Sequence, residues 1–171
     1  MDRMEELKQQ LTGLRPEEWD KIPDIDLYMD QVIGYVEQCL SPFRIHEKEK
    51  IITSSMVNNY VKQGLISPPV KKKYSQGHIA YIMIICIIKQ ILSISEICDY
   101  IKRQIETVPI QTAYDYFAEK LEESLYAAFT ATGTVDDGKD TDDAMLIKLV
   151  TTAFSDKIYL QKYLIYIDEN K

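Results

Sequence analysis

Apolar residues recur at three- and four-residue intervals along most of the chain, and this spacing predicts amphipathic helices. Breaks in the pattern fall at residues that start or stop helices: Gly64 suits a helix C-terminus, Ser93 opens a capping box, and Pro109 ends a helix. The pattern predicts seven helices, at about 2–12, 26–40, 54–63, 76–92, 94–108, 111–130 and 143–166. Between the third and the fourth, two prolines favour an extended path, and the basic segment 70–74 is predicted to be a short strand or turn.

Two of these helices are unusually apolar. Segment 79–88 is apolar until Lys89 interrupts it, which is about half the length needed to cross a bilayer, so a buried core helix and no membrane association are predicted. Helix 143–166 is apolar on nearly all sides and therefore needs partners on two sides, within a bundle or across a homodimer. The charged N-terminus has no apolar secretory segment, and the three cysteines form no close-spaced pair. Both observations favour a cytoplasmic location.

Negative charge predominates overall but is unevenly distributed. The 171-residue chain has a net charge of −7, yet residues 44–103 carry 10 basic and 4 acidic side chains. From Ile51 to Ser95 there is no Asp or Glu at all. A polyanion partner such as DNA would exclude acidic side chains in this way. A core-rich segment that carries few charges is the alternative.

Polar side chains in this basic region suit contacts with duplex DNA. Asn58, Asn59 and Lys62 share a face of helix 54–63, where Asn can pair with adenine and Lys can reach guanine or phosphate. The lysines that follow would neutralise phosphates without reading bases. The candidate DNA-contacting residues are Ser55, Asn58, Asn59, Tyr60, Lys62, Lys71, Lys72, Lys73 and Tyr74. The asparagines could instead only cap or solvate the helix, the lysines could form a solvated turn, and the tyrosines could serve mainly in packing.

Residues 51–97 resemble the DNA-binding core of the MerR family. The resemblance rests on an ordered set of motifs, namely Tyr60, Gly64-Leu65-Ile66, Pro68-Pro69, Lys72-Lys73-Tyr74-Ser75 and Ile94-Ser95-Glu96-Ile97. The run from Met56 to Lys62 and the run from Pro68 to Tyr74 resemble more closely an uncharacterised bacterial family, which carries a domain of unknown function with MerR-like character. The resemblance implies an all-α fold with three parts: an N-terminal helical arm (1–23), a winged helix-turn-helix (24–108) and a C-terminal helical bundle (109–171).

Together these features predict a DNA-binding transcriptional regulator that reads double-stranded DNA with helix 54–63 and a basic wing, 70–74. Its C-terminal helices could form a homodimer, and the identity of any small-molecule effector stays open. A protein- or ligand-binding module without DNA binding is the alternative, motivated by the net negative charge. No enzyme, cofactor or metal site is predicted, because the chain lacks the recognised phosphate-loop, nucleophile-elbow and zinc motifs. His46 and His78 are predicted to be surface or capping residues.

Overall fold

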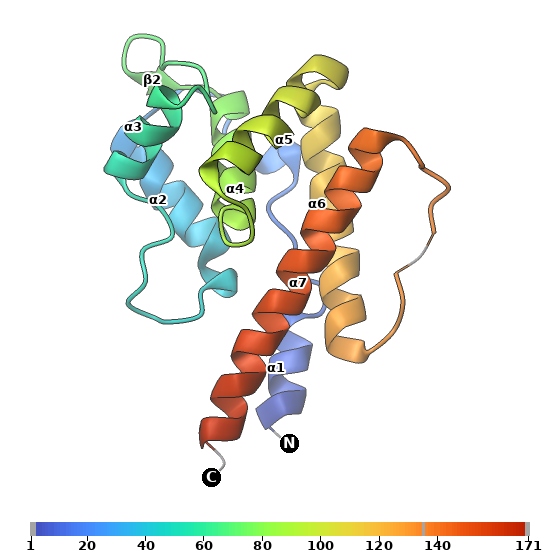
Figure 1. Cartoon of the computed structure of the whole chain (residues 1–171). Coiled ribbons are helices and arrows are strands. Elements are labelled where there is room, and N and C mark those ends of the chain that lie inside the picture. The colour runs from blue at the N-terminus through green and yellow to red at the C-terminus, as the bar shows by residue number, and fades with distance from the viewer. Residues whose placement is uncertain (1–2, 135, 170–171) are drawn as a thin grey trace.

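The computed structural model describes residues 3–134 and 136–169. They form a mostly helical chain, with 67% of the residues in seven helices, plus one two-stranded sheet (Figure 1). The helices are α1 (Arg3–Leu11), α2 (Met29–Leu40), α3 (Ser54–Lys62), α4 (Gln76–Ile88), α5 (Ile94–Thr107), α6 (Ile110–Thr130) and α7 (Asp142–Glu169). Single 3-10 turns, η1 (Trp19–Lys21) and η2 (Ser41–Phe43), interrupt the connections on either side of α2.

The predicted all-α fold is confirmed in its coarser form, a mostly helical chain, and the chain also forms one small sheet. Strand β1 (Leu27–Tyr28) pairs antiparallel with β2 (Lys73–Tyr74), so that Leu27 faces Tyr74 across the ladder. The predicted helix 26–40 therefore begins only at Met29. The side chain of Gln31 accepts a hydrogen bond from the backbone N–H of Tyr28 at 2.9 Å, which caps the helix and leaves the two preceding residues free to pair as a strand.

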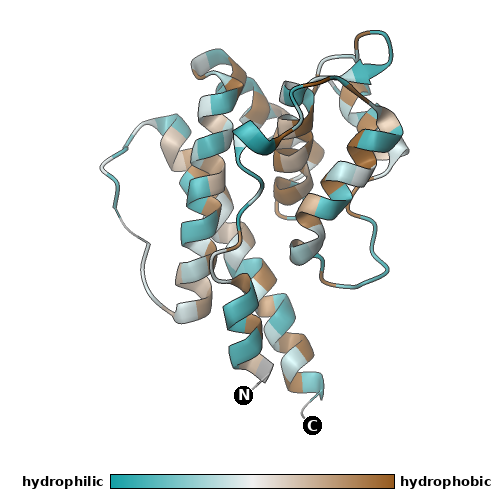
Figure 2. Cartoon of the chain, turned by 180° about the vertical axis from the view of Figure 1, so that it is seen from behind, coloured by the Kyte–Doolittle hydropathy of each residue, from teal (hydrophilic) through white to brown (hydrophobic). Residues whose placement is uncertain are grey.

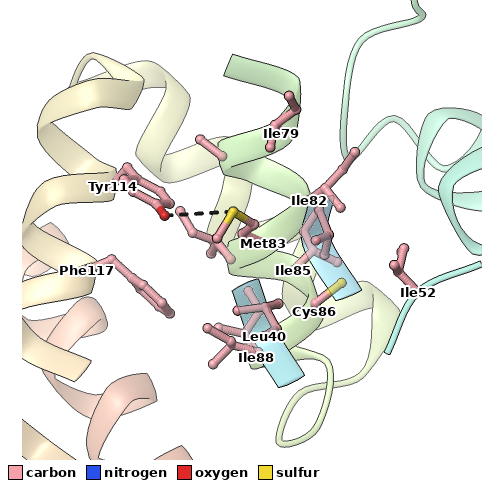
Figure 3. Close-up of a cluster of buried hydrophobic side chains, with 14 of the residues drawn as sticks. Leu40, Ile52, Ile79, Ile82, Met83, Ile85, Cys86, Ile88, Tyr114 and Phe117 are labelled. Carbon is pink, nitrogen blue, oxygen red and sulfur yellow. Dashed lines mark hydrogen bonds between the residues drawn. The ribbon is translucent and has the colours of Figure 1, made fainter. Parts of the chain in front are cut away.

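Helix α4 lies at the centre of the molecule. Its residues from Ile82 to Ile88 are all buried, because α2, α6 and α7 each pack against a different side of it. Figure 3 shows Leu40 of α2 and Tyr114 and Phe117 of α6 around this helix, and Figure 2 shows its apolar residues at the interior of the fold. The predicted buried core helix is confirmed. Among the described residues, no helix is both long and apolar enough to span a bilayer.

One thiol belongs to this centre. Cys86 is 1% exposed, and its Sγ faces the backbone oxygen of Ile51 at 3.9 Å (Figure 3 shows it near Leu40). Burial raises the pKa of the Cys86 thiol to about 12. The side chain is therefore a neutral part of the core.

Helices α6 and α7 form a long antiparallel pair beside the central helix, and α1 packs against both (Figure 1). The loop that connects α6 to α7 is held to both helices. The carboxylate of Asp137 accepts a hydrogen bond from Tyr116 at 2.9 Å and forms ion pairs with Lys120 at 3.1 Å and Lys148 at 2.6 Å. One acidic residue of the loop thus joins both helices.

Helix α7 has apolar residues on two sides. Val150, Phe154 and Ile158 face the core, whereas Leu149, Leu160 and Leu164 are more than half exposed. The three leucines follow one another at intervals of 11 and 4 residues, which keeps them on one side of an α-helix. The core-facing side is packed within the chain, and the second apolar side predicted from the sequence is exposed to solvent.

Candidate nucleic-acid interface

Helix α3 presents a polar face to solvent. Its N-cap is Thr53, whose hydroxyl accepts a hydrogen bond from the backbone N–H of Met56 at 3.3 Å. Val57 and Tyr60 turn toward the core and fix the rotation of the helix about its axis. The exposed residues are Ser54, Ser55, Asn58, Asn59 and Lys62. The helix thus offers two hydroxyls, two amides and one ammonium group over nine residues, with no acidic side chain between them.

The entry into α3 is held by a carboxylate that the sequence analysis did not single out. Glu37 of α2 accepts hydrogen bonds from the backbone N–H groups of Ile51 and Ile52, at 2.8 and 3.0 Å. Its other oxygen is paired with the guanidinium of Arg44. These contacts join α2 to the two residues that precede the N-cap of α3, and they position that helix from its neighbour.

A two-residue hairpin loop follows α3. The backbones of Val70 and Lys73 exchange two hydrogen bonds of 3.0 Å, and Lys71 and Lys72 occupy the loop between them. Both loop residues have positive φ, 50° and 64°, which makes the turn type I′. Asn and Gly are the residues that favour this turn, and side chains such as lysine are strained in it by roughly 1 kcal/mol each. Two exposed lysines therefore occupy a loop whose backbone does not favour them.

The base of the hairpin is fixed on both sides. The ammonium group of Lys73 lies 5.0 Å from the centroid of the Tyr28 ring, a cation–π contact with the paired strand. On the other side, Nδ1 of His78 accepts a hydrogen bond from the backbone N–H of Ser75 at 3.0 Å. Nε2 of the same ring contacts the backbone oxygen of Ser67, also at 3.0 Å. The predicted capping role of this histidine is confirmed, and the same ring also links the two chain segments that enter and leave the hairpin.

Two of the predicted contact residues lie in the core. Tyr60 and Tyr74 are each 3% exposed, and burial raises the pKa of both phenols. Tyr74 packs edge-on against the His78 ring with centroids 5.6 Å apart. This placement argues against base contacts by either ring. Both have the packing role that the sequence left open.

The remaining predicted residues lie in one part of the fold. Helix α3 and the hairpin that contains β2 occupy the same end of the molecule (Figure 1), and both belong to the segment without acidic residues. Of the three lysines in the hairpin, Lys71 and Lys72 are exposed and Lys73 is half-buried. The contacts from Glu37 to Ile51 and Ile52 and from His78 to Ser67 were not predicted, because they span 11 to 15 residues of sequence.

No curated protein and no solved structure matches the chain. A family model does match, over residues 17–117, and its description is a domain of unknown function, DUF1836. The matched segment begins before η1, includes α2, α3, the hairpin, α4 and α5, and ends within α6. It therefore includes every residue of the candidate interface and more than half of the chain. The chain belongs to this uncharacterised DUF1836 family.

Proposed function

We propose that the protein is a DNA-binding transcriptional regulator in which α2 and α3 form a helix-turn-helix and the hairpin at residues 70–74 is its wing. The observation that carries the proposal is the hairpin tip. Lys71 and Lys72 are exposed and strained there, in a segment of 45 residues that lacks any acidic side chain. Strain of this kind persists where a function requires it, and phosphate binding requires projecting cations.

Helix α3 would supply the reading of bases. Its exposed Asn58 and Asn59 carry amides that can pair with adenine in the major groove, and Lys62 can reach guanine or phosphate. The buried Tyr60 and Val57 would hold the helix against the core while its polar face enters the groove. Glu37 would act as a positioning residue by fixing the start of this helix.

A second copy of the chain would allow two such helices to read two half-sites. The exposed leucines of α7 support a homodimer, because they form an apolar side on a helix of 28 residues, about 42 Å long. A helix that is apolar on two sides is stable in water when both sides are covered.

The decisive experiment removes the two cations while improving the turn. The double variant K71N/K72G places the preferred type I′ pair in the loop, so the hairpin is expected to be as stable as in the wild type or more so. Binding to a random-sequence duplex is measured by fluorescence anisotropy over a salt series. The wild type is expected to lose affinity linearly on a log–log plot, and the variant to have a slope smaller by about 2.

The matched control is K21Q/K102Q, which removes the same charge from exposed positions outside α3 and the hairpin. It is expected to retain the wild-type slope. Equal slopes for K71N/K72G and the wild type, or no binding by the folded wild type at low salt, would contradict the proposal. The second outcome would favour a protein- or ligand-binding module, for which the exposed apolar side of α7 is the supporting observation.

A further inference from the structure

A pocket of about 650 Å³ lies between the proposed DNA-reading helix and the C-terminal helix. Met56 and Asn59 of α3 form one wall, and Lys157 and Gln161 of α7 form the opposite one. The charged loop that precedes α3 and the C-terminal end of α4 complete the lining. The family match ends at residue 117, so α3 belongs to the matched segment and α7 lies after it. The pocket is thus lined by residues from inside and outside the matched segment.

Two ammonium groups converge on the pocket. Lys89 donates to the backbone oxygen of Ile51, and Lys157 donates to the backbone oxygen of Gln90. Each ammonium has three N–H donors, so these carbonyl contacts leave donors for a further acceptor. Among the described residues, Glu49 is the one acidic residue that lines the pocket, and it is exposed. The carbonyl contacts hold the two lysines in place, and the two ammonium groups give the pocket a positive character.

The rest of the lining combines polar and apolar groups. The side-chain oxygen of Gln161 is buried and has no hydrogen-bond partner among the described residues. Buried polar atoms are nearly always paired, so an unpaired one at a pocket wall indicates a missing donor. Ile45, Met56 and Ile94 provide apolar surface within the same pocket.

From this lining we infer that the pocket binds a small organic anion, one that carries a carboxylate or similar group, an apolar body and a hydrogen-bond donor. The anionic group would lie between Lys89 and Lys157, the body against the apolar side chains, and the donor at Gln161. If the proposed function holds, the ligand acts as an effector. Its negative charge beside Asn59 would repel DNA phosphates, so DNA and ligand would weaken each other's binding reciprocally.

The test uses the full chain without DNA, so its outcome is independent of DNA binding. The ε-methyl group of Met56 is observed by ¹³C NMR during titration with 4-hydroxybenzoate, which carries a carboxylate, a ring and a hydroxyl. A saturable shift at Met56 is expected, with the resonances of Met83 in the core and Met145 on α7 unchanged. The neutral analogue 4-hydroxybenzamide and inorganic phosphate are each expected to bind at least about tenfold more weakly.

Variants assign the binding to the pocket. K157M is expected to weaken 4-hydroxybenzoate binding about tenfold. Because Lys157 also donates to the backbone oxygen of Gln90, K157M removes a structural contact as well as a charge. The variant Q161L leaves that contact in place and is expected to weaken 4-hydroxybenzoate binding too. K102M, an exposed lysine on α5, is the matched control and is expected to bind like the wild type.

Three results would overturn the inference: no saturable shift at Met56 with any of the three compounds, equal affinity for the acid and its amide, or equal affinity of K157M, Q161L and wild type. Phosphate that binds as tightly as 4-hydroxybenzoate would overturn the assignment to an organic anion. A ligand-induced loss of DNA affinity is then measured separately, by anisotropy at saturating 4-hydroxybenzoate.

Discussion

At the scale of single residues, the sequence predicted which side chains of α3 are exposed but not which residues hold the helix in place. Helical spacing assigned Asn58 and Asn59 to a polar face, and both are exposed. Spacing says nothing about contacts between distant segments. The role of Glu37 as a positioning residue therefore cannot be predicted without knowing that α2 packs beside the start of α3. A glutamate between the inward-facing positions of an amphipathic helix was the one available signal.

Glu37 leads to a prediction on stability and pH. Burial alone would raise the pKa of this carboxyl, but the N–H groups of Ile52 and Ile51 and the guanidinium of Arg44 lower it overall. Because the pKa in the folded protein lies below the unfolded value of about 4.3, the carboxylate stabilises the fold above that pH, and the contribution is lost as pH falls through the folded value. E37Q is expected to lower the free energy of unfolding by about 1 to 2 kcal/mol at pH 7.

Urea denaturation from pH 7 to pH 3 measures this effect. The stabilities of the wild type and E37Q are expected to approach each other as pH falls below the unfolded-state pKa and to converge once it is below the folded-state pKa. E47Q, in the exposed loop before α3, is the matched control and is expected to behave like the wild type. A difference between E37Q and the wild type that does not change with pH would disprove the electrostatic part of the explanation.

At the scale of elements, seven helices were predicted close to their observed bounds because the signals that start and stop helices are local. Ser93 and Glu96 form the capping box that the sequence predicted, with a 2.7 Å hydrogen bond from the Ser93 backbone to the carboxylate. Strand β1 was assigned to a helix because its pairing partner lies 46 residues later in the chain. Such a pairing has no local pattern, and two residues are too few for a visible alternation.

The loop between α6 and α7 was also only partly predictable. Its Gly- and Asp-rich composition indicated exposure, which holds for most of its described residues, but the ion pairs of Asp137 involve residues on two different helices. Lys148 and its other partners hold the pKa of Asp137 well below the usual range of an aspartate. Composition identifies a loop, whereas the contacts that anchor it depend on the packing of the helices it joins.

The variant D137N tests this anchor. Asn cannot form the ion pairs with Lys120 and Lys148, so the loop is expected to detach more often and to expose the bond after Lys139 to trypsin. Mass spectrometry is expected to detect cleavage there several-fold faster than in the wild type. D136N removes the same charge from an exposed position of the same loop that does not adjoin the cleaved bond, and it should leave the rate unchanged. Equal rates for D137N and the wild type would mean that the contacts of Asp137 do not hold the loop.

At the scale of the whole molecule, charge is distributed unevenly along the chain. The basic region from residue 44 to residue 103 contains α3 and the hairpin, and acidic residues predominate before and after it. The exposed leucines lie instead on α7. The sequence predicted this arrangement, since both features follow from composition along the chain, but the pocket between α3 and α7 arises only when the two helices are packed around α4.

The leucines lead to a prediction on oligomeric state. Light scattering after gel filtration is expected to give the wild type about twice the mass of the 19.9 kDa chain. The double variant L160Q/L164Q removes apolar area from the exposed side of α7 and is expected to be monomeric. I105Q changes an exposed apolar residue of α5 instead, so it should remain dimeric. A monomeric wild type at tens of micromolar protein would contradict the homodimer.

The position of Cys86 gives the protein an internal chemical reporter. Cys39 and Cys98 are half-buried, whereas Cys86 reacts only after α4 has left its neighbours, since it is buried and its thiol is kept neutral. A thiol reagent added in excess should therefore modify Cys39 and Cys98 early. It should modify Cys86 more slowly, at a rate set by how often α4 separates from its neighbours. The mass of the labelled chain over time would record how often the interior opens under native conditions, with no mutation and no attached probe.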